Sequence, residues 1–274
     1  MILYIIPTGR FFLIKIKMNN MKICVLIKQV ASEDSVLNLN SDKKKLNEDG
    51  LNLVSNEPDT YGLEEALQLK DKTDGEVVVC TVGPESSRQV IKDALAKGAE
   101  RGIFISNDSI EHNDPLSIAK LIANAIKNEN FDLILSGLQS NDNGHAQVGL
   151  LVAELLNTSH ASLVMGTELI NENTIKVKQE LENGWFQWSE LDLPASLTIQ
   201  SGLNTPRYAT LKGIMSVKSK TVDDGEIETN INSEFNLVER FIPQKTKETI
   251  KIEGSTDEVV EELLDVLKNK IKVI

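Results

Sequence analysis

Short apolar runs alternate with amphipathic stretches along the first half of this chain. Buried strands are expected where apolar residues follow one another closely, in 22–28, 76–82, 101–106 and 131–135. Helices are expected where apolar residues recur at helical spacing, in 61–71, in 86–97, after Asp114-Pro115, and in 148–156. Asp59 or Thr60 is the expected N-cap of the first helix. The alternation predicts an α/β fold, with a mostly parallel sheet covered by helices on both faces.

The pattern changes after residue 156. Two runs of alternating apolar and polar residues, 175–181 and 185–191, flank Asn183-Gly184, which is the strongest short-range signal of a β-hairpin. Its aromatic residues are expected in the core or in cross-strand pairs: Trp185, Phe186 and Trp188, the last two on one face. Residues 195–200 form a last strand, and the antiparallel elements are expected to extend the same domain.

The C-terminal third has less core of its own. Residues 203–220 mix apolar and basic side chains and fit neither period, so exposed Leu211, Ile214 and Met215 predict a docking surface there. Residues 221–253 are polar and predict an extended arm. The arm leads to a final helix that Ser255-Thr-Asp-Glu258 would cap. A short helix on a long arm needs a surface to pack on, either in this chain or in another one.

Residues 1–20 are apolar but interrupted by charged residues and a proline, and they lack the features of a secretory signal. We expect them to be a non-native or disordered extension ahead of a start at Met18 or Met21, a hypothesis that an intact mass would test. The expected organisation is then an α/β domain over 21–201, a recognition loop over 202–220, and an arm with a helix over 221–274.

Composition narrows the classes of partner. A formal charge of −12 over 274 residues argues against a nucleic-acid partner, because binding to the phosphate backbone needs a basic surface. No apolar stretch reaches the ~18 residues that span a bilayer, and the expected compartment is the cytoplasm. Cys24 and Cys80 lie inside apolar runs and are expected as buried free thiols. The histidines form no metal-ligand pattern with them.

The sequence contains no recognisable catalytic constellation. It has no Walker-type lysine loop, no Gly-x-Gly-x-x-Gly after a strand and no Gly-x-Ser-x-Gly elbow. The adjacent acids Glu64-Glu65 and Glu261-Glu262 are expected on solvated helix faces. These residues suit the binding of a nucleotide better than the making or breaking of a bond.

The best candidate site is the loop 138–147, between an expected strand and an expected helix. A helix N-terminus can bind a phosphate through backbone N–H groups alone. The loop also carries amide and carboxylate groups suited to a ribose or a base: Gln139, Asn141, Asp142, Asn143 and Gln147. In parallel sheets, ligands bind beyond the carboxyl ends of the strands, so residues 28–32, 56–59 and 82–83 are expected nearby. An ordinary strand–helix connection is the alternative.

Five segments in order resemble one family, the β subunit of electron transfer flavoprotein. They are Lys28-Gln-Val30; Asn56-x-x-Asp-x-x-x-Leu-Glu-Glu-Ala66; Thr81-Val-Gly-Pro84; Gly137-x-Gln-x-x-Asp142 with Ala146-Gln-Val-Gly149; and Leu203-Asn-x-Pro-Arg-Tyr-Ala-Thr-Leu-x-x-Ile-Met215. The resemblance covers Met21 to about Lys220 and the arm more loosely. It implies a Rossmann-like fold of the adenine nucleotide alpha hydrolase type.

The resemblance also implies cofactors and partners. It implies a heterodimer with an α subunit that holds most of the FAD, while this chain buries AMP or, in bifurcating members, a second FAD. The nucleotide-contacting positions would be Leu26, Asn56, Glu57, Pro58, Asp59, Val82, Leu138, Gln139, Ser140, Asn141, Asp142, Asn143, Gly144, His145, Ala146 and Gln147. Leu211 would anchor acyl-CoA and related dehydrogenases, and the arm and final helix would lie against the α subunit.

The chain departs from the family pattern at three places. Asn56-Glu-Pro-Asp59 lacks an aromatic residue that is usual there, Asn143-Gly144-His145 replaces an acidic or Gly-Asp-Thr sequence, and Leu26 stands where a small residue is common.

The favoured interpretation is an electron carrier rather than an enzyme, passing electrons from dehydrogenases, as in fatty acid β-oxidation, to the electron transfer flavoprotein–quinone oxidoreductase. The alternatives are a stand-alone adenine-nucleotide sensor or ATP-using enzyme, and a bifurcating β subunit that oxidises NADH.

Overall fold

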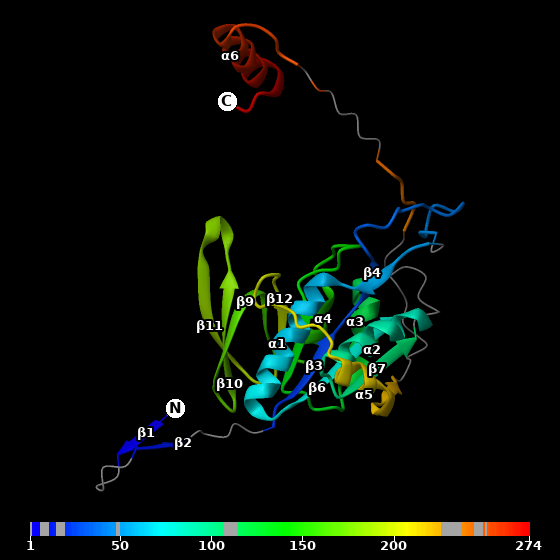
Figure 1. Ribbon diagram of the computed structural model, residues 1–274, viewed down its shortest axis with the longest axis vertical. Coiled ribbons are helices and arrows are strands. Elements are labelled where there is room, and N and C mark those ends of the chain that lie inside the picture. The colour runs from blue at the N-terminus through cyan, green and yellow to red at the C-terminus, as the bar shows by residue number, and fades with distance from the viewer. Residues whose placement is uncertain are drawn as a thin grey trace.

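A nine-stranded sheet forms the centre of the computed structural model, which describes residues 2–5, 11–14, 20–47, 50–106, 114–225, 237–243, 249 and 251–274 (Figure 1). Within these residues the strand order is β11-β10-β9-β12-β8-β3-β6-β7-β13. The strands are β3 (Lys22–Leu26), β6 (Glu76–Gly83), β7 (Arg101–Ser106), β8 (Leu133–Gly137), β9 (Ser159–Asn171), β10 (Thr174–Glu180), β11 (Phe186–Asp192), β12 (Ala195–Ile199) and β13 (Val222–Asp224).

In the order of the sheet, all neighbouring strands between β9 and the β13 edge run parallel: β9, β12, β8, β3, β6, β7 and β13. On the other side of β9, β10 and β11 add an antiparallel hairpin. The predicted fold class, a mostly parallel α/β sheet with an added hairpin, is therefore confirmed. All four strands predicted in the first half of the chain are present, although β8 begins at Leu133, two positions later than expected.

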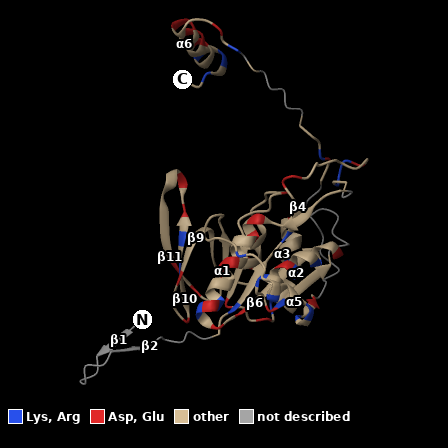
Figure 2. Cartoon of the chain, in the orientation of Figure 1, with Lys and Arg blue, Asp and Glu red and all other residues tan. Residues whose placement is uncertain are grey.

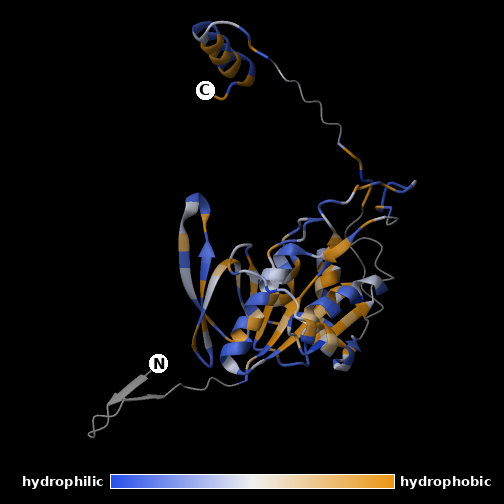
Figure 3. Cartoon of the chain, viewed as in Figure 1, coloured by the Kyte–Doolittle hydropathy of each residue, from blue (hydrophilic) through white to orange (hydrophobic). Residues whose placement is uncertain are grey.

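Helices cover both faces of the sheet, as predicted. They are α1 (Glu57–Thr73), α2 (Arg88–Lys97, after a 3₁₀ turn at Glu85–Ser87), α3 (Pro115–Ile126) and α4 (Val148–Leu155). Side chains alternate across β3, so Ile23 and Val25 pack with α1 and α2, whereas Cys24 and Leu26 pack with α3 and α4. Figure 3 shows the resulting apolar layers between sheet and helices.

The start of α1 differs from the prediction. The helix begins at Glu57 with Asn56 as N-cap, so the expectation of Asp59 or Thr60 is wrong. Pro58 lies in the first turn, where a missing N–H leaves no hydrogen bond unmade. The cap of α3 is as expected, since the Asp114 carboxylate accepts from the backbone N–H groups of Leu116 and Ser117.

Several strands have little sequence signal of their own. The sequence did not predict β9, β13, or the antiparallel pair β4 (Gln29–Ala31) and β5 (Leu53–Ser55). Bulges shift the register between β9 and β10, and such shifts interrupt the alternation by which a strand is recognised. The other three strands are only three residues long.

The hairpin forms where predicted, around a 3₁₀ turn at Glu182–Gly184. Its aromatic residues are not in the core: Trp185, Phe186 and Trp188 are 72%, 44% and 50% exposed. The expectation of core burial is wrong, because the hairpin extends past the helices and buries only the opposite face, with Ile175 and Val177. Cross-strand contacts remain, since the Lys178 ammonium lies 3.9 Å from the centre of the Phe186 ring.

The chain ends follow the expected order. The 203–220 segment contains the short helix α5 (Leu211–Ser216) and a 3₁₀ turn at Val217–Ser219. At the C-terminus, α6 (Thr256–Asp265) begins with the predicted capping box of Ser255 and Glu258 and continues as a π-helical turn at Val266–Ile271. Figure 1 shows α6 standing clear of the sheet.

Parts of the predicted arm, 226–236, 244–248 and 250, lie outside the described residues. In the N-terminal extension the structure describes two antiparallel strands, β1 (Ile2–Ile5) and β2 (Phe11–Ile14). That residues 1–20 are non-native or disordered stays a prediction. Among the described residues, no helix has the length and apolar character needed to cross a membrane.

Candidate functional site

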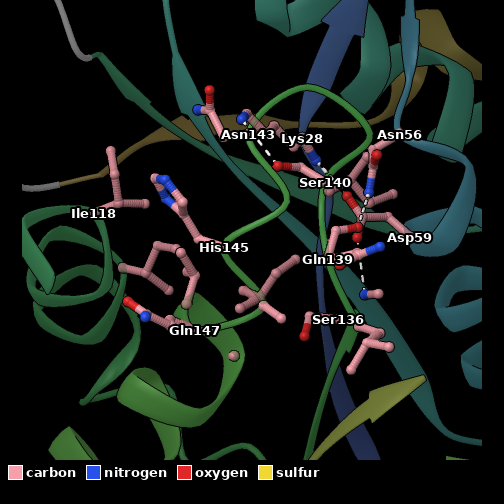
Figure 4. Close-up of a pocket in the computed structure, with 18 of the residues that line it drawn as sticks. Lys28, Asn56, Asp59, Ile118, Ser136, Gln139, Ser140, Asn143, His145 and Gln147 are labelled. Carbon is pink, nitrogen blue, oxygen red and sulfur yellow. Dashed lines mark hydrogen bonds between the residues drawn. The ribbon is translucent and has the colours of Figure 1, made fainter. Parts of the chain in front are cut away.

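A pocket opens at the carboxyl ends of β3 and β8, which are neighbours in the sheet (Figure 4). The chain proceeds from β3 outward to β6 and β7 on one side and returns to β8 on the other side, so the strand order switches between β3 and β8. Ligands of open α/β sheets bind at such a switch point. The topology therefore brings together the three segments that the sequence predicted to meet: the end of β3, the start of α1 and the loop after β8.

Asn56 and Asp59 form the buried polar side of the pocket. The Asp59 carboxylate accepts one hydrogen bond from the backbone N–H of Lys28 and one from that of Gly137, both at 2.8 Å. The Asn56 side chain donates to the carbonyl of Gln139 at 3.0 Å and accepts from the N–H of Asn141 at 2.9 Å. Burial raises the pKa of Asp59 to about 6, although the two backbone hydrogen bonds favour its ionised form.

Lys28 brings a cation to the same loop. Its ammonium lies 2.6 Å from the Asp142 carboxylate and 3.3 Å from the Ser140 hydroxyl. Burial works to raise the pKa of Asp142, but attraction to Lys28 outweighs it and holds that pKa below its usual value. An ion pair therefore lies at the rim of the pocket. The sequence placed Lys28 near the loop but did not pair it with Asp142, because the two residues are far apart in the chain.

The opposite wall is apolar. Leu26, Cys80 and Val82 come from the strands, and Ile118 and Ile122 come from α3. The sequence did not single out Ile118 or Ile122, since only the packing of α3 on this face of the sheet brings them there. Burial raises the pKa of the Cys80 thiol to about 12, so this side chain is a neutral part of the wall. Such a wall suits one face of a planar base.

The loop itself bends sharply before α4. Gly144 has φ of +63° and Ala146 has φ of +53°, and the N–H of Gly144 donates to the carbonyl of Ser140 at 2.9 Å. Figure 4 shows His145, Gln147 and Ile118 on the side of the loop away from Asn56 and Asp59. The Ser136 hydroxyl, which also lines the pocket, is buried with no hydrogen-bond partner among the described residues. It is a polar group that a bound molecule can satisfy.

Most of the predicted cofactor-binding residues line this pocket: Leu26, Asn56, Asp59, Val82, Leu138, Gln139, Ser140, Asn143, His145, Ala146 and Gln147. The other predicted residues lie beside the pocket without lining it: Glu57, Pro58, Asn141, Asp142 and Gly144. Glu57 is exposed and Pro58 is buried in the first turn of α1. Gly137, Ser136 and Gly149 line the pocket in addition.

The described residues contain no group of three or more histidine, cysteine or acidic side chains that could hold a metal ion. The pocket offers backbone N–H groups, amides, a lysine and an apolar wall instead. A nucleotide fits this chemistry: its phosphate suits the backbone N–H groups and the lysine, its ribose suits the amides, and its base suits the apolar wall.

A second surface is formed by the 203–220 segment. Leu211 is 82% and Met215 77% exposed, and Ile214 is half exposed, in agreement with the expected exposure of this segment. The base of the segment is held firmly, since the Arg207 guanidinium bonds both oxygens of Glu64, Nε at 2.8 Å and a terminal nitrogen at 3.1 Å. Asn204 donates to Glu65 and to the carbonyl of Tyr61, both at 3.1 Å.

The expectation that Glu64 and Glu65 are solvated is wrong, because both are buried under this segment. Burial would raise the pKa of Glu64, but the hydrogen bonds from Arg207 prevail and hold it below its usual value. The described pair Glu261-Glu262 is exposed, as expected. Figure 2 shows acidic residues in red along α1, the helix that carries Glu64 and Glu65.

Comparisons with known proteins match most of this chain. The family model described as electron transfer flavoprotein domain matches residues 44–229. The chain is 34% identical to electron transfer flavoprotein subunit beta of Methylophilus methylotrophus, over 90% of this chain and 98% of that protein. It is 33% identical to the protein of the same name from Bacillus subtilis, over 84% and 91% of the two chains. The mitochondrial subunit beta of Arabidopsis thaliana is 32% identical, over 93% of this chain and all of that protein.

Proposed function

Since this chain belongs to the electron transfer flavoprotein β-subunit family, we propose that it pairs with an α subunit carrying FAD and binds AMP in the pocket at the β3–β8 switch point. In this function the chain does not catalyse the making or breaking of covalent bonds. It positions the flavin-bearing partner and docks the proteins that exchange electrons. The observation that carries the proposal is the convergence of Lys28, the 138–147 loop and the apolar wall on one pocket.

The parts of a nucleotide suit different parts of this pocket. The backbone N–H groups before α4, with Lys28 nearby, suit a phosphate. The amides of Gln139 and Gln147 suit a ribose, and the wall containing Ile118 and Ile122 suits an adenine. AMP presents all three parts, and its phosphate would lie near the Lys28 ammonium, which also contacts Asp142.

The exposed apolar residues of α5 suit a docking role toward dehydrogenases. Leu211, Ile214 and Met215 lie on a segment whose base is held by Arg207, so the apolar tip is presented on a firm support. An apolar tip on a fixed base loses little conformational entropy when a partner covers it. A quinone oxidoreductase would receive the electrons.

The C-terminal arm suits the α subunit. On α6, Val260, Leu263 and Leu264 are 41–49% exposed, and the described residues of the arm expose Val238, Phe241 and Ile242. A covering partner would remove this apolar surface from water.

Co-expression with the α subunit tests the proposal. The expected product is a yellow heterodimer with one FAD and one AMP after extraction and chromatography. Two FAD molecules with NADH oxidation would indicate the bifurcating alternative, and a colourless homodimer that hydrolyses ATP would overturn the proposal.

A further inference from the structure

The Asn56 side chain makes no hydrogen bond to the backbone of α1, the helix that this residue caps. An asparagine at this position usually accepts a hydrogen bond from an N–H of the first helical turn, and Asn56 makes no such bond. Its amide instead forms two bonds in opposite directions with the loop after β8, to the Gln139 carbonyl and from the Asn141 N–H. The side chain is 1% exposed. It thus pairs with the loop as a neighbouring strand would.

Asp59 joins two strands where their own pairing ends. The register of β3 with β8 stops at Val25 opposite Leu135. Beyond that point, the Asp59 carboxylate accepts from the N–H groups of Lys28 and Gly137, one from each chain segment. A Cβ on Gly137 would lie 2.5 Å from an Asp59 carboxylate oxygen. Glycine at 137 therefore allows the carboxylate to enter the gap between the strands.

We propose that Asn56 and Asp59 are positioning residues that fix the shape of the 138–147 loop and of the β3 end, and that they do so before any nucleotide is bound. This inference rests on the proposed nucleotide function and deepens it. The resemblance placed residues 56–59 among the nucleotide contacts, whereas the hydrogen bonds of these two side chains are directed to the protein's own backbone. Their contribution to affinity is to pre-organise the loop, which lowers the entropic cost of binding.

The test uses the heterodimer, with AMP as the probe. Amide hydrogen exchange is measured on the nucleotide-free complex over peptides that cover 135–147 and 26–30. Asn56→Ala should raise exchange at the Asn141 amide, and Asp59→Ala should raise it at Lys28 and Gly137. Each variant should also release AMP roughly tenfold faster, as expected when one or two buried hydrogen bonds are lost.

Milder and unrelated substitutions serve as controls. Asn56→Asp keeps an acceptor for the Asn141 N–H but loses the donor to Gln139, so it should retain protection at Asn141 and lose AMP more slowly than Asn56→Ala. This variant also covers the case in which the alanine variants fail to fold. Thr60→Ala removes a hydroxyl that bonds only the Glu57 carbonyl of its own helix, and it should leave exchange and AMP release unchanged.

Two results would overturn the inference. One is faster AMP release with unchanged exchange in the nucleotide-free complex, because that result would make these side chains direct ligands. The other is wild-type exchange and wild-type AMP release in both alanine variants. If the wild-type complex binds no AMP while exchange rises as expected, the nucleotide function fails and the effect of the two residues on the loop stands.

Discussion

Burial decides what each polar side chain around the pocket can do. Asp59 is buried, yet it sits between two backbone N–H groups that favour its ionised form. Ser136 is buried with no partner among the described residues. A polar group without a partner costs free energy that a bound ligand can recover. Asp59 therefore leads to a prediction about how stability depends on pH, and Ser136 leads to a prediction about stability and ligand affinity.

Asp59 should make stability depend on pH. Burial raises its pKa from an ordinary value of 3.8 to about 6 in the folded protein, so between these pH values the folded state holds a proton that the unfolded state has lost. The stabilising contribution is complete below about pH 4 and is lost as the pH rises through 6. The free energy of unfolding of the wild type, minus that of Asp59→Asn, should fall by roughly 2.5 kcal/mol between pH 4 and pH 7. Denaturant unfolding at matched pH measures this difference, and a constant difference would contradict it.

Ser136→Ala should have opposite effects on stability and on binding. Removal of an unpartnered buried hydroxyl should raise the stability of the nucleotide-free protein by about 1 kcal/mol. The same change should weaken AMP binding several-fold, on the order of 1 kcal/mol, because the ligand loses a hydrogen-bonding group. Thermal unfolding and calorimetric titration measure the two effects. Destabilisation together with unchanged affinity would show that the hydroxyl has a structural partner instead.

At the scale of elements, α1 serves both functional surfaces. Its first turn holds the pocket through Asn56 and Asp59, and its middle holds the base of the docking segment through Glu64 and Glu65. The inner face of the same helix packs Leu63, Ala66 and Leu67 on the sheet. The polar residues of α1 therefore form hydrogen bonds to other segments, both at the start of the helix and in its middle.

Arg207→Ala should loosen the docking segment. Glu64 would remain buried without its bidentate partner, which should destabilise the protein by roughly 2–3 kcal/mol. Electron transfer from a dehydrogenase should slow, while AMP and FAD content stay unchanged, because Arg207 is remote from the pocket lining. Asp71→Ala is the matched control, since Asp71 lies 3.4 Å from the guanidinium on the exposed side. Equal effects of the two substitutions would exclude the Glu64 pair as the main anchor.

At the scale of the whole molecule, exposed apolar side chains of the described residues gather at the tip of α5, on the aromatic face of the β10–β11 hairpin and on the apolar side of α6. Val238, Phe241 and Ile242 of the arm are also exposed. Large exposed apolar patches mark interaction surfaces, and a subunit of a larger assembly exposes them until its partners are bound. The net charge of −12 does not by itself specify which protein covers these surfaces.

Leu211→Ala should separate docking from cofactor binding. The truncation removes most of an 82% exposed apolar side chain from α5. Electron transfer from a dehydrogenase should therefore slow about tenfold or more. This factor corresponds to a loss of at least about 1.4 kcal/mol of binding free energy at the interface. FAD and AMP content and the thermal midpoint should stay as in the wild type. Leu155→Ala, an exposed leucine on α4, is the control. Unchanged rates for Leu211→Ala would remove the docking role from α5.

The sequence by itself determined the central strands, the helices beside them and their order along the chain. Apolar periodicity identified the central strands and their helices, Asp114-Pro115 and Ser255–Glu258 marked two helix starts, and Asn183-Gly184 marked the hairpin. These signals are local, because each depends on residues a few positions apart. The rule that ligands bind at the carboxyl ends of parallel strands then brought residues 28, 56–59 and 138–147 to one place.

Only the tertiary structure decided which faces are covered and which side chains meet. It buried Glu64 under Arg207, added Ile118 and Ile122 to the pocket wall, paired Lys28 with Asp142 and left the hairpin aromatics exposed. Each of these contacts joins residues far apart in the chain or depends on where a covering element ends. Strand order and helix packing determine such contacts, and the spacing of apolar residues within one segment cannot predict them.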